Sequence, residues 1–267
     1  MSNYIVNADD LGMTPGTNKA IFEGYDSGYI NSTSVMTNCD YFNEAIHGLK
    51  ERKDLKAGIH LNLTYGKSLN KSIVFCDSDG IFNLGYLQLI YNSIVSDNFL
   101  EEVEIELELQ IQKAIENGIN ISHLDSHRHI HLIPNIYKIV YNLSNKYNIN
   151  RVRLVNENIF YSLKLTKKVN FFINGGLIKY FLLFFFTMFN KIYGNKYNDI
   201  SFYSILYTGV IDQNSLYKLM SSDIFYEIVV HPSHINLDNN ITFYNDAEKS
   251  YRLSKNRSFE LLGILKK

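Results

Sequence analysis

The chain has 267 residues, of which 46% are hydrophobic and 20% charged, and its formal net charge is −1. This composition supports a sizeable core and excludes an intrinsically disordered protein. A charge near zero does not indicate a general binder of nucleic acid or of anionic membranes. Two cysteines, Cys39 and Cys76, are too few for a disulfide framework, and the N-terminus lacks the features of a signal peptide. These features predict a cytoplasmic protein.

Short apolar runs alternate with longer helical patterns along the chain. Strands are expected at residues 4–6, 30–36, 55–61, 121–125, 152–155, 200–206 and 227–231. Helices are expected at residues 18–27, 42–51, 98–116, 134–146 and 246–265. The alternation predicts a parallel sheet with crossover helices. We expect a distorted or seven-stranded (β/α) barrel within a single domain over residues 1–267, with an open doubly wound sheet as the alternative.

Residues 180–189 read YFLLFFFTMF and carry no charge. A helix that spans a membrane needs about 20 apolar residues, so this run is too short and no transmembrane segment is expected. The run indicates a buried amphipathic helix or an interface helix, for which a homodimer is one explanation. A membrane-contacting or lid helix is the alternative.

Side chains that can carry chemistry stand where four of the predicted strands end. They are Asp9 and Asp10, His60, Asp125 with His127, and His231. Each position has an ordinary explanation when it is taken alone: a helix cap, a hydrogen-bonded core histidine, or a turn. Because the carboxyl ends of parallel strands meet at one face, we expect these side chains to lie together. Two histidines and a carboxylate commonly hold a divalent metal and leave positions open for water and substrate.

The segment HLDSHRHIH at residues 123–131 alternates polar and other residues. On one continuous strand its four histidines and one aspartate would crowd a single face. We therefore expect a strand that ends near Asp125, then a loop with His127 and His129, and a helix that opens at Pro134. For His129 and His131, a surface position without a role remains the alternative.

Several motifs resemble those of the YdjC-like carbohydrate deacetylase family, and they occur in the order typical of that family. They are NADDLG at 7–12, NSTSVMTN at 31–38, GIHLNLT at 58–64, HLDSHRHIHLIP at 123–134, EIVVHPS at 227–233 and the ending RSFELL at 257–262. The resemblance implies a (β/α)-barrel-like fold related to the polysaccharide deacetylases. It also implies hydrolysis of the N-acetyl group of an acetylated amino sugar, in an N-acetylglucosamine-containing oligosaccharide or glycolipid. The Phe-rich stretch at 171–190 falls in the variable region of the family, so a helical insert is expected at about 158–198.

The resemblance assigns roles to individual residues. Asp10, His60 and His127 would bind one divalent metal ion, Mg or Zn. Asp9 would be the general base and His231 a general acid, with Asp125 and Arg153 supporting the site from outside. The alternatives are a metal-dependent hydrolase of another amide or ester bond, and a non-catalytic sugar-binding protein on the same fold.

Overall fold

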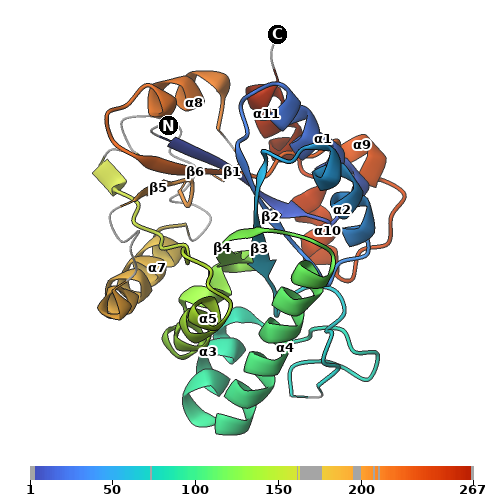
Figure 1. Cartoon of the computed structure of the whole chain (residues 1–267), viewed down its shortest axis with the longest axis vertical. Coiled ribbons are helices and arrows are strands. Elements are labelled where there is room, and N and C mark those ends of the chain that lie inside the picture. Colours follow the sequence, from blue (N-terminus) through green and yellow to red (C-terminus); the bar gives the residue numbers. More distant parts are fainter. Residues whose placement is uncertain are drawn as a thin grey trace.

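The computed structural model describes residues 4–72, 74–160, 162, 176–194, 200–206, 208–209 and 211–265. In these residues one sheet contains β1 (Tyr4–Leu11), β2 (Ser32–Val35), β3 (Lys56–Leu61), β4 (Ile121–Ser126), β5 (Ser201–Tyr203) and β6 (Tyr226–Val230). The strand order is β4-β3-β2-β1-β6-β5, and every pairing is parallel. The sheet lies at the centre of the molecule with helices around it (Figure 1).

An irregular segment, residues 151–157, joins the two edge strands. On one side the N–H of Leu124 in β4 donates to the carbonyl of Arg151, and the N–H of Arg153 donates back to Leu124. On the other side Glu157 forms an isolated parallel bridge with Phe202 of β5. The prediction of a regular seventh strand at 152–155 is therefore wrong. An irregular segment takes the position of that strand between β4 and β5. Since one segment contacts both edge strands, the predicted barrel-like fold is confirmed, and the alternative of an open doubly wound sheet is not.

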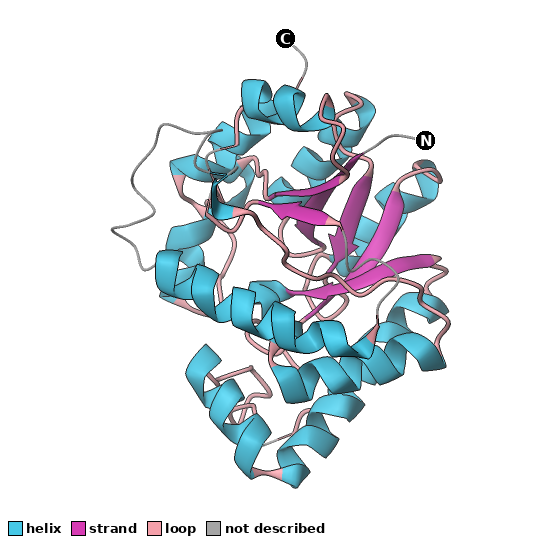
Figure 2. Cartoon of the chain, turned by 90° about the vertical axis from the view of Figure 1, so that its left-hand side faces the viewer, coloured by secondary structure: helices cyan, strands magenta, loops and turns pink. Residues whose placement is uncertain are grey.

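Helices cover the outside of this curled sheet (Figure 2). They are α1 (Pro15–Asp26), α2 (Phe42–Glu51), α3 (Tyr86–Val95), α4 (Asp97–Glu116), α5 (Pro134–Lys146), α7 (Gly176–Asn190), α8 (Gln213–Met220), α9 (Ile235–Asp238), α10 (Asp246–Arg252) and α11 (Lys255–Ile264). Helices α2 and α5 begin and end where the sequence predicts. Helix α1 begins three residues earlier than expected, because Thr14 caps it and Pro15 occupies its first turn. The helix expected at 246–265 is interrupted and forms α10 and α11.

The residues of β1 alternate between an apolar outside and a polar inside. Val6 and Ala8 belong to the main hydrophobic core. Asn7 and Asp9 instead join a buried network in which Asn7 Nδ2 donates to Asp9 Oδ1 and to Ser34 Oγ of β2. Barrels of this kind more often fill their interior with branched apolar side chains. The polar interior places hydrogen-bonded groups directly beneath the carboxyl ends of the strands.

Candidate active site

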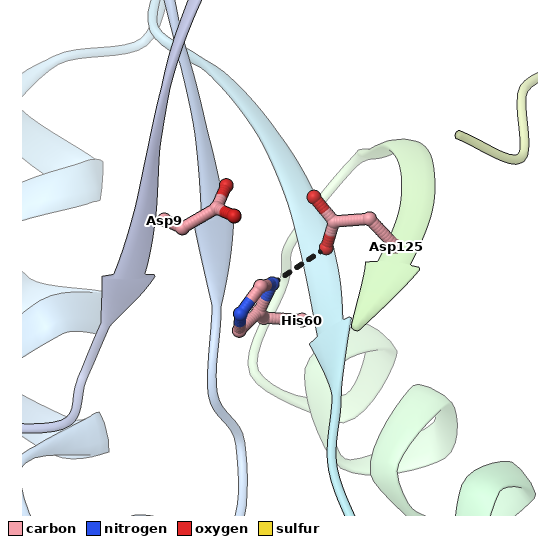
Figure 3. Close-up of side chains that lie close together, drawn as sticks. All are labelled: Asp9, His60 and Asp125. Atoms are coloured by element: carbon pink, nitrogen blue, oxygen red, sulfur yellow. Dashed lines mark hydrogen bonds and ion pairs between the residues drawn. The ribbon is translucent and has the colours of Figure 1, made fainter. Parts of the chain in front are cut away.

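The predicted site residues converge at the carboxyl ends of the strands. Asp9 and Asp10 lie near the end of β1, His60 in β3 and Asp125 in β4, as Figure 3 shows for three of them. His127 is the first residue of η1 (His127–Leu132), and His231 directly follows β6. All of these side chains are buried except that of His231, which is 15% exposed. His231 is therefore the member of the set nearest to solvent.

A bulge in β1 brings two adjacent carboxylates into the site. The register between β1 and β2 shifts between Ala8 and Leu11, and Asp10 has a φ of 75°. Neighbouring residues on a regular strand point to opposite faces. The bulge and the left-handed backbone of Asp10 remove that constraint, a conformation that costs free energy and is found mainly at functional sites.

Arg153 pairs with the first of these carboxylates. Its Nη1 and Nη2 each lie 2.9 Å from an oxygen of Asp9, and Nη2 also lies 2.6 Å from Asp125 Oδ2. Glu227 of β6 accepts a hydrogen bond of 2.8 Å from Nε of the same guanidinium. Arg153 therefore lies inside the site, where its hydrogen bonds hold both oxygens of Asp9. Burial raises the pKa of Asp9, although the charge of Arg153 opposes this shift.

His60 has its two ring nitrogens directed at different carboxylates. Its Nδ1 lies 2.8 Å from Asp125 Oδ1, and its Nε2 lies 3.4 Å from Asp10 Oδ1. Burial lowers the pKa of His60, but the charges of Asp125 and Asp9 outweigh burial and raise it to about 10. A histidine that donates one N–H to a carboxylate has its other nitrogen fixed in direction, as in the carboxylate–histidine pairs of metal sites.

Two overlapping sets of donors are candidates for holding a metal ion: the first is brought together by the structure, and the second is the one that the family resemblance implies. Asp9, His60 and Asp125 can each offer one ligand atom, and these atoms lie within 4.8 Å of one another. Arg153 already contacts both oxygens of Asp9 and Oδ2 of Asp125, and Ser34 Oγ donates to the same Oδ2 at 2.6 Å. Oδ1 of Asp125 is hydrogen-bonded to His60. A metal on this set would have to displace those contacts.

The second set is centred on Asp10. Its Oδ1 is buried and accepts no hydrogen bond from the described residues, while His60 Nε2 stands 3.4 Å away. His127 lies close to His60, with 6.0 Å between ring centroids, and its Nδ1 contacts Thr64 Oγ1 at 2.9 Å. Burial lowers the pKa of His127, which favours the neutral form that ligates metals. Asp10, His60 and His127 are thus neighbours, but among the described residues their ligand atoms do not form a group within 4.8 Å of one another. Arg252 also contacts both Asp10 and His127.

Helix α10 contributes two side chains that sequence analysis did not predict. Arg252 Nη1 donates to Asp10 Oδ2 at 2.5 Å, and Arg252 Nη2 lies 3.4 Å from His127 Nε2. Glu248 accepts from Arg252 Nε at 2.9 Å, and its Oε1 lies 3.6 Å from His127 Nε2. In the sequence, Glu248 and Arg252 are spaced like an ordinary exposed helix pair, so nothing local marks them as site residues.

The RSFELL motif holds the backbone of His231. Glu260 Oε2 accepts from the His231 N–H at 2.7 Å, and Arg257 Nη1 donates to the His231 carbonyl at 3.0 Å. The ring faces the site, with Nε2 3.8 Å from Asp9 Oδ2. Burial, followed by the positive charge of Arg257, lowers the pKa of His231 well below its usual range.

The two remaining histidines of the third motif differ from one another. His131 is buried between Ser126 Oγ, 2.5 Å from its Nδ1, and the carbonyl of Arg153, 3.0 Å from its Nε2. The alternative of a surface position for His131 is therefore wrong. His129 is half-buried and has a φ of 57°, so its backbone is left-handed.

The sequence model of one protein family, described as YdjC-like protein, matches residues 3–263. The chain belongs to the YdjC-like family. A carbohydrate deacetylase of Clostridium beijerinckii is 32% identical over 66% of this chain and 71% of its own length. A carbohydrate deacetylase of Thermoanaerobacter pseudethanolicus is 37% identical over 56% of this chain, and the alignment spans only 59% of that relative.

A solved structure shares the fold of this YdjC-like chain. It is described as a proposed cellobiose-phosphate cleavage protein of Enterococcus faecalis and aligns with a TM-score of 0.63. The alignment covers 98% of this chain and 90% of that protein, at 21% sequence identity. At this identity the likeness supports the fold alone.

Proposed function

We propose that this chain is a metal-dependent carbohydrate deacetylase that removes the N-acetyl group from an acetylated amino sugar. The observation that carries the proposal is the separation of the two adjacent carboxylates. Both oxygens of Asp9 are held by Arg153, whereas Asp10 keeps a buried oxygen without a hydrogen bond beside His60. One carboxylate is thereby suited to proton transfer and the other to binding a cation. The deacetylases named among the relatives support the choice of bond.

Asp10, His60 and His127 are the residues that would hold one divalent cation. Two imidazoles favour Zn, and a site with carboxylate and water ligands also accepts Mg. When bound, the cation lowers the pKa of water and polarises the acetyl carbonyl. Asp125 serves this set by fixing the direction of the His60 ring through Nδ1.

Asp9 is the residue that takes the proton of the attacking water. Its raised pKa makes it a better proton acceptor than an exposed aspartate, while the two hydrogen bonds from Arg153 fix its orientation. Its second oxygen lies 3.8 Å from His231 Nε2, so a proton taken by Asp9 has a nearby acceptor.

His231 is the residue that donates a proton to the departing amine. Because burial and the charge of Arg257 lower the pKa of His231, we expect His231 to receive that proton during turnover. Arg257 and Glu260 keep the backbone of His231 in place for this transfer. The products are acetate and the free amino sugar.

The test is release of acetate and amine from N-acetylglucosamine oligomers of increasing length, with metal-stripped protein and Zn, Mg, Mn or Co added back. We expect the two products in equal amounts, and only after a metal is added. Binding of the sugar without any turnover would instead identify a sugar-binding protein. Turnover of other amides or esters, but not of acetylated amino sugars, would identify a different hydrolase.

A further inference from the structure

Helix α7 buries one side and leaves an apolar side uncovered. Tyr180, Leu183, Thr187 and Asn190 are buried. The opposite side, here called the α7 face, consists of six residues that are 49% to 77% exposed: Ile178, Phe181, Phe185, Met188, Phe189 and Ile192. They recur at helical spacing and continue into η3 (Lys191–Tyr193). This answers the question left open by the YFLLFFFTMF run, because the helix is not wholly buried.

The sequence of α7 and its flanks carries charge of one sign. Residues 176–194 contain no aspartate or glutamate, and their two lysines, Lys179 and Lys191, stand near the two ends of the stripe. In the sequence, the longer stretch 158–198 carries six lysines and no acidic residue, a net charge of +6 within a chain of net charge −1. The small net charge of the whole chain therefore conceals a strongly basic stretch of sequence, although four of its lysines lie outside the described residues.

Helix α3 also exposes apolar residues, but without basic residues beside them. Leu87, Tyr91, Ile94 and Val95 form a second exposed apolar stripe on α3. That stripe carries no lysine, and α4 follows it at once with exposed acidic residues, beginning at Asp97. An anionic surface would attract the α7 face and repel the surroundings of α3.

We propose that the α7 face docks on an anionic lipid surface, with its aromatic side chains in the interface and the positive charge of the surrounding sequence favouring the anionic headgroups. An apolar stripe flanked by lysines is the pattern of helices that lie in the plane of a membrane. No helix in the described ranges is long and apolar enough to cross one. A second copy of the chain is the less suitable occupant, because pairing α7 with itself would bring two basic regions together.

The position of α7 connects this surface with the candidate active site. Helix α7 lies beside α5 (Figure 1) and packs against η1. Asn190 Nδ2 donates to the carbonyl of Leu132 in η1 at 2.8 Å. Because η1 begins with His127, docking through α7 would hold the site close to the lipid surface. The inference goes beyond the proposed reaction and does not depend on it.

The experiment is co-sedimentation of the protein with vesicles of equal parts phosphatidylglycerol and phosphatidylcholine, without metal or substrate. The test variant is Phe185→Ser/Phe189→Ser, and the matched control is Leu87→Ser/Ile94→Ser on α3, with folding of both checked by circular dichroism. We expect the α7 pair to weaken vesicle binding by about tenfold or more and the α3 pair to leave it unchanged. A higher salt concentration should weaken binding, and vesicles of phosphatidylcholine alone should bind poorly.

Three outcomes would overturn the proposal. The first is no binding of the wild-type chain to the anionic vesicles. The second is an equal loss for the α7 and α3 pairs, which would make apolar area alone responsible. The third is a wild-type dimer in light scattering that Phe185→Ser/Phe189→Ser dissociates without any vesicle binding, which would assign the face to a second copy.

Discussion

Asp9 and Asp10 are adjacent in the chain but contact different arginines. Arg153 forms two hydrogen bonds with Asp9, and Arg252 pairs with Asp10 from α10. The bulge in β1 makes this separation possible, because it lets both carboxylates point into the site. Residues that repel one another when they share an environment can then have distinct roles.

Replacing Asp9 tests this division of roles. Asp9→Asn should keep its metal and lose about 10²–10⁴ in the rate of acetate release, because the general base is removed while the ligands remain. Metal content after dialysis and turnover are measured on the same sample, with thermal unfolding to confirm the fold. Asp10→Asn is the matched control and should lose the metal. If Asp9→Asn loses its metal and excess metal restores activity, Asp9 is a ligand of the kind suggested by its closeness to His60 and Asp125.

Glu157 lies away from the catalytic carboxylates and should make stability depend on pH. Burial raises its pKa to about 7, despite hydrogen bonds from Ser162 and the Ile205 N–H. Between the ordinary carboxyl pKa and about 7, the folded state keeps a proton that the unfolded state has lost. The contribution of Glu157 to stability therefore falls as pH rises through this range and stays low above it.

Glu157→Gln should remove that dependence. At pH 8 the variant should be more stable than the wild type by about 1–3 kcal/mol, and near pH 4.5 the two should be equal. Urea unfolding of both proteins at the two pH values measures the difference. A variant that is less stable at pH 8 would show that the ionised carboxylate is needed for its backbone hydrogen bonds.

At the scale of elements, β3 and β4 pack closely at Gly58. A Cβ at this position would lie 2.3 Å from the ring of His123, which is buried and has a pKa lowered to about 4, chiefly by burial. Gly58→Ala should therefore destabilise the protein by about 1–3 kcal/mol. His123→Ala should make room, so the double variant should lose less than the sum of the single variants. Additive losses in chemical unfolding would contradict the packing argument.

Helix α10 places a positively charged arginine beside the proposed metal ligands. Arg252 pairs with Asp10, so a metal that binds Asp10 must compete with this guanidinium. Arg252→Met should bind metal about tenfold more tightly, as measured by competition with a chelator. Arg128→Met is the control, because Arg128 pairs with Glu248 and not with Asp10. Weaker metal binding by Arg252→Met would mean that the arginine supports the shape of the site.

The strand ends could be predicted from sequence because local patterns determine them. The apolar runs before Asp9, His60 and Asp125 predicted strands, and parallel strands bring their carboxyl ends together. The contact of Arg252 with Asp10 spans 242 residues and leaves no local signal. The segment that contains the expected strand at 152–155 is irregular: Arg151 and Arg153 bond to β4, whereas Asn156 and Glu157 contact β5. No single-sequence pattern records this change of partner.

At the scale of the whole molecule, the barrel has a polar interior and two kinds of surface. The interior supplies buried carboxylates, histidines and arginines at one end of the sheet. The outside carries the apolar α7 face within a basic stretch of sequence, while the chain as a whole stays near neutral. Net charge alone would miss that contrast, since the acidic residues are concentrated elsewhere in the sequence.

The most direct test of the account is a titration of metal-stripped protein with a divalent metal, in which acetate release is plotted against bound metal per chain. We expect no turnover without metal and a linear rise that levels off at one metal ion per chain. Acetate release that does not depend on metal, or metal that binds stoichiometrically without any hydrolysis of acetylated amino sugars, would contradict the proposed deacetylase.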